Sequence, residues 1–402
     1  MAEEQIIQAT DNITYPGGFK ANGMNCGIKF KNNDLGAIVS EQECTVAGMF
    51  TTNRVKSESL MYSMPIVKRG RAKALLVNSG NANTCIGRQG VKDARTAAKA
   101  LARQLGVGGK EVLFFSTGII GRPLPVGKII ECMPALTSGL SDNAMPMAQA
   151  IMTTDTKPKI VAEEADIGGK KVKLVGIAKG SGMISPKLAT MLCFIATDAN
   201  ISQDGLKKTL AASVNTTFNR ITIDGDTSTN DSVVVMANGM AGNSQIGSEG
   251  EMLAKFGNAL QSVCARLARM LIEDAEGATK FITVTVKGSP DVKSAEGIAF
   301  AVADSKLVKT AMFGNNPNVG RIIAAVGYAK VKFRVKPNKV ALRVNGIECF
   351  REGKLLYDEA RAIDLKGRFI EIEIDLGSGN EEATIWTSDL SFDYVKINAE
   401  YN

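Results

Sequence analysis

Apolar residues recur along several segments of the chain at spacings that predict particular secondary structures. Between 251 and 274 they fall three or four residues apart, which predicts a long amphipathic helix packed on a core. The segment 91–106 has the same helical period and is rich in alanine. After Phe369, the segment 368–377 alternates isoleucine with acidic residues, which predicts a half-exposed antiparallel strand.

Short apolar runs that end in polar or glycine-containing turns predict further strands. These runs lie at 75–83, 111–118, 191–197 and 281–288. Pro-Asn and Asn-Gly pairs within 335–350 predict hairpin-type turns. Helix and strand patterns therefore occur together, and the chain is predicted to have an α/β (α+β) fold.

The length of 402 residues suggests more than one packed unit. The character of the sequence changes after Gly277, where alternating strand patterns become frequent. We therefore predict a large α/β domain over 1–280 and a smaller C-terminal α+β domain over 281–402.

The chain contains no histidine, which excludes Ser-His-Asp and Cys-His catalytic groups and histidine zinc sites. A base that works near pH 7 must then be a desolvated lysine or a free α-amino group, whose unperturbed pKa is about 7.7–8. The stretch 224–231 fails as a calcium loop because Val235 stands where a ligating glutamate is needed. No Walker or dinucleotide-binding motif is present, so neither a metal nor a nucleotide cofactor is expected.

The remaining composition bears on partners and compartment. The net charge of +7 is spread along the chain, and the few aromatic residues do not alternate with basic ones, so no nucleic-acid partner is expected. Seven scattered cysteines without a C-x-x-C pair fit a reducing cytoplasm. No apolar run can span a bilayer and no export signal is visible.

Thr190 interrupts an apolar run, directly after the glycine-containing stretch AKGSGMISP at 178–186. Its hydroxyl is able to attack the carbonyl of Ala189, and hydrolysis of the resulting ester leaves Thr190 with a free α-amine. One residue then supplies nucleophile and base, as N-terminal threonine enzymes require. The ordinary alternative is a threonine at the start of a buried strand.

The chain resembles the ornithine acetyltransferase family, also called the arginine-biosynthesis bifunctional proteins, over essentially its whole length. The resemblance is carried by the junction segment AKGSGMISPKLATML and by seven further motifs in the family's order: VNSGNAN (77–83), FSTGIIG (115–121), MTTDTKPK (152–159), TIDGDTSTND (222–231), EDAEGATK (273–280), GNNPNVGRI (314–322) and DYVKINAEY (393–401). Ser185, Lys187 and Leu188 depart from the residues usual in the family.

The resemblance implies a fold and a set of site residues. The fold would be the layered α/β sandwich of the N-terminal-nucleophile type, cleaved between Ala189 and Thr190 into chains 1–189 and 190–402. Thr190 would be the nucleophile, with its own amine as base. Thr117 and Gly118 would form the oxyanion hole. The substrate-binding residues would be Thr153, Lys179, Thr190, Glu276 and Asn398, with Glu276 facing the ammonium of the donor.

The resemblance also implies an activity. Acetyl would move from N2-acetyl-L-ornithine to L-glutamate through an acetyl-enzyme, by a ping-pong route that needs no cofactor. Some members of the family also accept acetyl-CoA as the acetyl donor. The expected assembly is a heterotetramer of two α and two β chains in the cytoplasm.

Two other functions are compatible with parts of this pattern. An aminopeptidase or amidohydrolase of the N-terminal-nucleophile type would use water in place of glutamate as the acceptor. An uncleaved, non-catalytic protein that binds an amino acid is the second alternative, and the altered residues before Thr190 are its main support.

Overall fold

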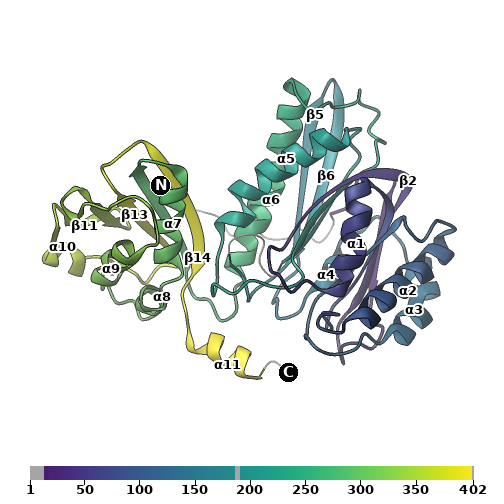
Figure 1. Cartoon of the computed structure of the whole chain (residues 1–402), viewed down its shortest axis with the longest axis horizontal. Helices are drawn as coiled ribbons and strands as arrows, with labels where there is room; N and C mark the ends of the chain where they lie inside the picture. Colours follow the sequence, from purple (N-terminus) through teal and green to yellow (C-terminus); the bar gives the residue numbers. More distant parts are fainter. Residues whose placement is uncertain (1–12, 186–190, 401–402) are drawn as a thin grey trace. The chain divides into compact units, whose positions relative to one another are not determined.

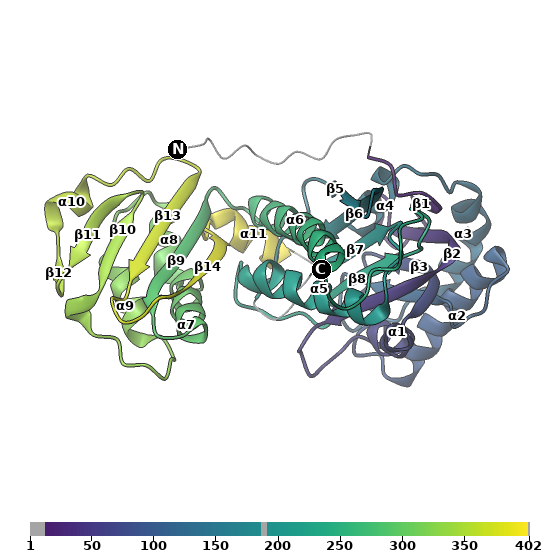
Figure 2. The same cartoon turned by 90° about the horizontal axis from the view of Figure 1, so that it is seen from above.

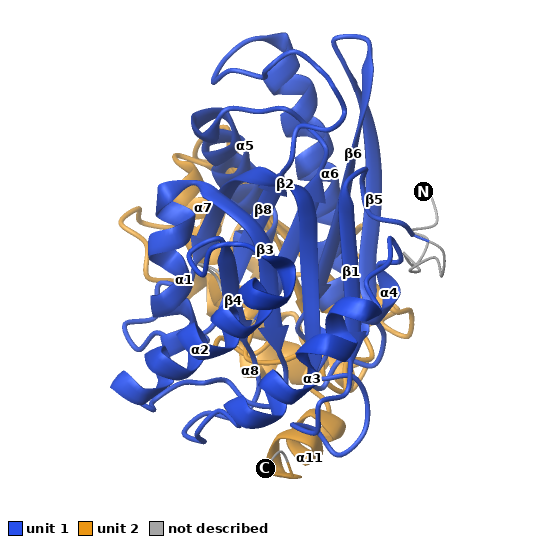
Figure 3. Cartoon of the chain, turned by 90° about the vertical axis from the view of Figure 1, so that its right-hand side faces the viewer, with its two compact units in different colours: residues 1–180, 187–219, 227–271 blue, residues 181–186, 220–226, 272–402 orange. Residues whose placement is uncertain are grey.

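The computed structural model describes residues 13–185 and 191–400 (Figure 1). The chain divides into two compact units, which Figure 3 shows in different colours. Unit 1 comprises residues 1–180, 187–219 and 227–271, and unit 2 comprises residues 181–186, 220–226 and 272–402. The domain boundary at 280 and the two cleavage products stay predictions. No helix of the described residues is both long and apolar enough to cross a membrane.

Unit 1 contains an eight-stranded mixed sheet in the order β4-β3-β2-β8-β7-β6-β5, with β1 paired to β2. The strands are β1 (Phe19–Met24), β2 (Leu35–Phe50), β3 (Arg71–Asn78), β4 (Val112–Ser116), β5 (Lys159–Ile167), β6 (Lys170–Lys179), β7 (Leu192–Thr197) and β8 (Ser232–Ala237). The helices are α1 (Glu58–Arg69), α2 (Arg88–Leu105), α3 (Val126–Ser138), α4 (Met145–Ile151), α5 (Gln203–Thr216) and α6 (Glu251–Glu273), and the short 3-10 helix η1 spans Phe218–Arg220.

The sheet of unit 1 folds over its own core. The rings of Phe115 on β4 and Phe194 on β7 lie 5.2 Å apart, although β3, β2 and β8 separate their strands. In a flat sheet four strand spacings would amount to about 19 Å. The long strand β2 allows this bend, because its pairing with β3 shifts register between Val39 and Cys44.

Helices cover both outer faces of this sheet. Ala97 and Leu101 of α2 share an apolar cluster with Leu76 of β3, and Val263 of α6 lies against Gly176 of β6. Figure 1 shows α2 and α3 on one side of these strands and α5 and α6 on the other. The predicted layered α/β fold is therefore confirmed.

The free edge of β4 is covered by α1. The Ser63 hydroxyl accepts a hydrogen bond from the Phe114 N–H at 2.8 Å and donates one to the Phe114 carbonyl at 2.7 Å. A side chain thus takes the place of a neighbouring strand, which satisfies backbone groups that an edge would leave open. Because β4 leads directly into the predicted oxyanion turn, this contact also fixes where that turn begins.

Unit 2 contains a six-stranded mixed sheet in the order β12-β11-β10-β13-β9-β14, which Figure 2 shows from above. Its strands are β9 (Phe281–Ser289), β10 (Ala341–Val344), β11 (Ile347–Arg351), β12 (Lys354–Leu355), β13 (Phe369–Asp375) and β14 (Glu381–Ser388). Its helices are α7 (Val292–Ala303), α8 (Lys306–Phe313), α9 (Gly320–Tyr328), α10 (Tyr357–Arg361) and α11 (Phe392–Glu400), with the 3-10 helix η2 (Pro337–Lys339).

The alternating pattern at 368–377 forms strand β13, with Ile370, Ile372 and Ile374 buried. The prediction that this strand is purely antiparallel is wrong, because β13 pairs parallel with β9 and antiparallel with β10. Helices α7, α8 and α9 follow β9 in the chain, and a crossover connection of this length permits parallel pairing. The predicted Asn-Gly turn joins β10 to β11, with positive φ at Asn345 and Gly346.

Candidate active site

The turn Thr117-Gly118 follows the fully buried strand β4. The Thr117 N–H donates to the Asn78 carbonyl at 3.0 Å. Gly118 has a φ of +130°, and a Cβ there would lie 2.4 Å from the carbonyl carbon of Gly80. Only glycine therefore fits at this position. No described residue hydrogen-bonds to the Thr117 hydroxyl.

Buried amide and hydroxyl side chains support this turn from below. Ser116 donates to Asn78 Oδ1 at 2.7 Å. The Asn230 amide donates to the carbonyls of Ser116 at 2.7 Å and Ala82 at 2.8 Å. Thr84 donates in turn to Asn230 Oδ1 at 2.9 Å. Such a satisfied buried network holds a backbone in one conformation.

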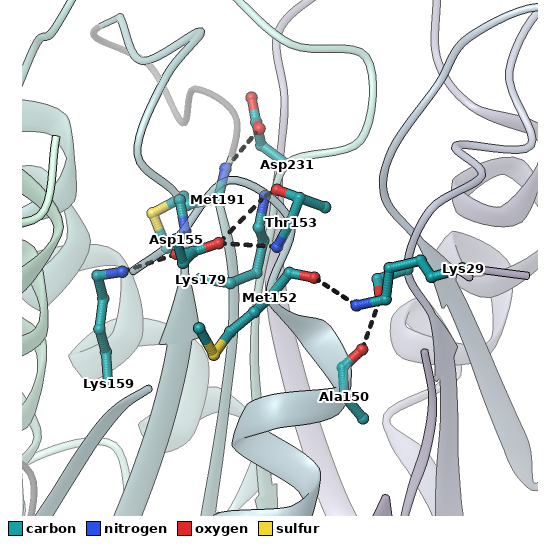
Figure 4. Close-up of polar contacts among 11 residues, drawn as sticks. Lys29, Ala150, Met152, Thr153, Asp155, Lys159, Lys179, Met191 and Asp231 are labelled. Carbon is teal, nitrogen blue, oxygen red and sulfur yellow. Dashed lines mark hydrogen bonds and ion pairs between the residues drawn. The ribbon is translucent and has the colours of Figure 1, made fainter. Parts of the chain in front are cut away.

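Lys179 lies at the end of β6 and contacts Thr153. Its ammonium donates to the Thr153 hydroxyl at 2.7 Å, as Figure 4 shows. Thr153 is half-buried, whereas Lys179 is 2% exposed. The structure thus brings together two residues that are distant in the sequence and were both predicted to bind substrate.

Asp155 organises this pair, although sequence reasoning did not single it out. Its Oδ1 is 2.7 Å from the Lys159 ammonium and accepts from the Gly180 N–H at 2.7 Å. Its Oδ2 accepts from the Thr153 N–H at 3.0 Å and lies 4.0 Å from Lys179 Nζ. Burial by itself would raise the pKa of Asp155, but Lys159 and Lys179 outweigh it and hold that pKa well below its usual range.

Ala189 and Thr190, the predicted cleavage residues, lie outside the described residues. The described residue that follows them is Met191, whose N–H donates to Asp231 Oδ1 at 2.9 Å. Asp231 is fully buried, and its Oδ2 has no partner among the described residues. Burial raises the pKa of Asp231, against the opposing effect of the Met191 N–H and the Lys179 charge.

The other two predicted binding residues belong to unit 2 and contact each other. Asn398 of α11 donates to Glu276 Oε2 at 2.7 Å. Glu276 lies against Gly182, where a Cβ would come within 2.4 Å of Oε2. Its own N–H donates to the Ser181 carbonyl at 2.8 Å. Glu276 therefore presents a carboxylate beside the glycine-containing stretch that precedes the predicted junction.

A second acidic group of unit 2 adds to this negative charge. Asp224 Oδ2 accepts from the Met183 N–H at 2.6 Å and from the Tyr394 hydroxyl at 3.1 Å. Burial and then the charge of Asp224 raise the pKa of Tyr394, so that the phenol keeps its proton. No group of three or more acidic or cysteine side chains in the described part of the chain could hold a metal ion.

Comparison with known proteins identifies close relatives. Residues 20–402 match the model of the ArgJ family. The chain is 45% identical to the arginine biosynthesis bifunctional protein ArgJ of Thermotoga neapolitana, over 96% of this chain and 99% of that protein. It is 43% identical to the ArgJ protein of Listeria monocytogenes, over 97% of this chain and 98% of that protein.

Two similar solved structures match part of the chain. The crystal structure of ArgJ from Bacillus halodurans is 36% identical, with 42% of this chain and 91% of that chain covered and a TM-score of 0.40. The structure of ornithine acetyltransferase from Mycobacterium tuberculosis in complex with ornithine is 31% identical, with 43% and 94% covered and a TM-score of 0.38.

Proposed function

Because the chain belongs to the ArgJ family, we propose that it transfers acetyl from N2-acetyl-L-ornithine to L-glutamate in arginine biosynthesis. The match over residues 20–402 is the observation that carries this function. The relatives named above match over nearly their whole length. The chain is thus an acyltransferase.

The reaction proceeds in two halves. The Thr190 hydroxyl attacks the acetyl carbonyl of N2-acetylornithine, and its proton passes to the α-amine of Thr190. Collapse of the tetrahedral intermediate breaks the C–N bond, and ornithine leaves with that proton. The α-amine of glutamate then attacks the acetyl ester, which releases N-acetylglutamate and restores the threonine. One amide replaces another, so no cofactor is required.

Thr117 and Gly118 stabilise the negative oxygen of both tetrahedral intermediates. The Thr117 hydroxyl and the Gly118 N–H are the donors. This role is supported by the absence of another described partner for the hydroxyl and by the rigid network beneath the turn. Donors that are fixed before the reaction lose no energy to reorganisation when charge develops.

Lys179 and Thr153 bind the α-carboxylate that donor and acceptor share. The positive charges of Lys159 and Lys179 both lie within 4.0 Å of the single carboxylate of Asp155. The surplus favours an anion. Glu276, with Asn398, binds the side-chain ammonium of N2-acetylornithine, and its support is the acidic character of its surroundings.

Four further features belong to the same proposal. The chain cleaves itself between Ala189 and Thr190, and the fragments 1–189 and 190–402 assemble as a heterotetramer of two α and two β chains. Acetyl-CoA also serves as a donor. The enzyme works in the cytoplasm, where its cysteines stay reduced; all seven are free in the structure.

Two measurements test this function. Purified protein is incubated with N2-acetylornithine, with and without glutamate, and ornithine and N-acetylglutamate are quantified. Formation of both products in equal amounts supports the transferase, whereas ornithine release that ignores glutamate would indicate a hydrolase. Denaturing mass spectrometry should show two fragments; a single uncleaved and inactive chain would favour the non-catalytic binding protein.

A further inference from the structure

Thr153 and Asp155 line a cavity of about 510 Å³ in unit 1. Lys29, Gln149 and Met152 are among its other lining residues. This volume is in the usual range for small-molecule sites. Lys29 is the cationic residue of this lining, and it comes from the loop between β1 and β2, far from Thr153 in the sequence.

The Lys29 ammonium donates one hydrogen bond to a described residue. Its Nζ donates to the Met152 carbonyl at 3.0 Å. Figure 4 shows the Lys29 side chain pointing toward Met152, the residue directly before Thr153. Among the described residues no carboxylate lies within ion-pair distance of it, whereas Lys159 is paired with Asp155. An ammonium has three donors, so two remain for a ligand.

The loop that carries Lys29 is tightly built. The fully buried Asp34 accepts from the N–H groups of Cys26, Ile28 and Lys29 at 2.6–2.7 Å. Its carboxylate is therefore occupied by backbone groups. Three charge-assisted hydrogen bonds to one carboxylate hold a loop in a defined conformation.

Gly80 connects this lysine to the oxyanion turn. A Cβ on Gly80, whose φ is +88°, would lie 2.8 Å from Lys29 Cγ. Gly118 packs against the backbone of the same glycine, because its own Cβ would lie 2.4 Å from the Gly80 carbonyl carbon. Lys29 is thus in close contact with the residue that supports the oxyanion turn, and its ammonium reaches the residue next to Thr153.

We propose that the Lys29 ammonium binds the side-chain carboxylate of glutamate and so selects the acceptor. The inference rests on the proposed transferase function. Donor and acceptor share an α-carboxylate, but only glutamate carries a second one. A cation additional to Lys179 therefore contributes to binding in the acceptor half-reaction and not in the donor half-reaction.

Lys29→Met tests this assignment, with Lys29→Arg as the conservative variant. In a ping-pong reaction, kcat/KM for each substrate reports its own half-reaction. For Lys29→Met, kcat/KM for glutamate should fall roughly 10- to 100-fold, the effect of losing a hydrogen bond between charged groups. The value for N2-acetylornithine should change by less than about twofold, since no contact with the donor is assigned to Lys29. Lys29→Arg should recover part of the loss.

Glutamine serves as the neutral acceptor. The ratio of kcat/KM for glutamate to that for glutamine does not depend on the amount of folded enzyme, so it stays interpretable if the variant folds poorly. This ratio should fall in Lys29→Met and stay at the wild-type value in the control Lys31→Met, which removes an exposed charge from the same loop.

An unchanged glutamate-to-glutamine ratio in Lys29→Met would overturn the proposal. Equal losses for both substrates would also overturn it, because they would assign Lys29 to the shared α-carboxylate or to general structure. Wild-type protein that transfers no acetyl to glutamate would instead overturn the proposed function itself, together with this inference.

Discussion

Substitution of Asp155 by asparagine should strongly destabilise unit 1. The side chains of Asp155 and Lys159 are both completely buried, with 2.7 Å between the carboxylate and the ammonium. Asparagine preserves the shape but removes the charge, so the buried Lys159 ammonium loses the carboxylate that lies 2.7 Å from it. Breaking a buried pair in this way costs about 3–5 kcal/mol. For a unit of this size the melting temperature should fall by roughly 6–20 °C.

Thermal unfolding followed by circular dichroism measures this effect, with two matched variants. Glu251→Gln removes one partner of an exposed pair at 2.9 Å and should leave the melting temperature unchanged, because solvent screens such pairs. Adding Lys159→Met to Asp155→Asn should recover part of the loss, since one of the two buried cations beside residue 155 is then removed as well. The reasoning is refuted if the melting temperature of Asp155→Asn lies within about 2 °C of wild type. It is also refuted if adding Lys159→Met lowers the melting temperature again by as much as Asp155→Asn did.

The pH dependence of this difference has a defined sign. The pKa of Asp155 is lower in the folded protein than its usual value, so its contribution is fully present above about pH 4, near the unfolded pKa. It is lost as the pH falls from there toward the folded pKa. The gap between wild type and Asp155→Asn should therefore be constant between about pH 5 and 7 and shrink below about pH 4. A gap that widens on acidification would contradict the assigned charge state.

The remaining predictions concern the chemistry. In steady-state assays of acetyl transfer, Thr117→Ala should lower kcat roughly 100- to 1000-fold, as loss of an oxyanion donor does. An unchanged kcat would exclude the Thr117 hydroxyl from the mechanism. Thr190→Ala should give one full-length chain by mass spectrometry and no acetyl transfer, whereas Thr190→Ser should keep some activity. Wild-type activity should rise through about pH 7.7–8 as the α-amine of Thr190 deprotonates. Glu276→Gln should lower kcat/KM for N2-acetylornithine about 10- to 100-fold more than for glutamate, and equal losses would exclude its role toward the ammonium.

Hydrophobic spacing was sufficient to predict the elements whose burial is regular. The stripe at 251–274 forms α6, and the run at 281–288 forms β9. The same information could not identify neighbours in a sheet. The alternation at 368–377 correctly predicts which face of β13 is buried, but a parallel and an antiparallel partner bury that face equally well. The 16-residue strand β2 and its bend likewise have no periodic signal.

The buried charges were the least predictable part of the site. Asp155 and Lys159 are four residues apart, a spacing that usually indicates an exposed pair, yet both side chains are inaccessible to solvent. Their burial depends on the end of β6, where Gly180 donates to Asp155, and that contact joins distant segments. Asn78 and Asn230 lie within motifs that carried the resemblance, but their hydrogen bonds with Ser116, directly before the predicted oxyanion turn, required the fold to be known.

The two proposed substrates impose a charge requirement on the enzyme. N2-acetylornithine and glutamate share an α-carboxylate, and their side chains have opposite charges. One enzyme that accepts both in turn needs a cation for the common group and charges of both signs for the side chains. In the proposed mechanism, Lys179 would serve the first need, Glu276 would serve the donor, and Lys29 would serve the acceptor. Glu276→Gln and Lys29→Met should therefore produce complementary defects: the first impairs formation of the acetyl-enzyme, and the second impairs its reaction with glutamate. This expected division follows from charge alone, because each substituted side chain is assigned to a group that only one of the substrates carries.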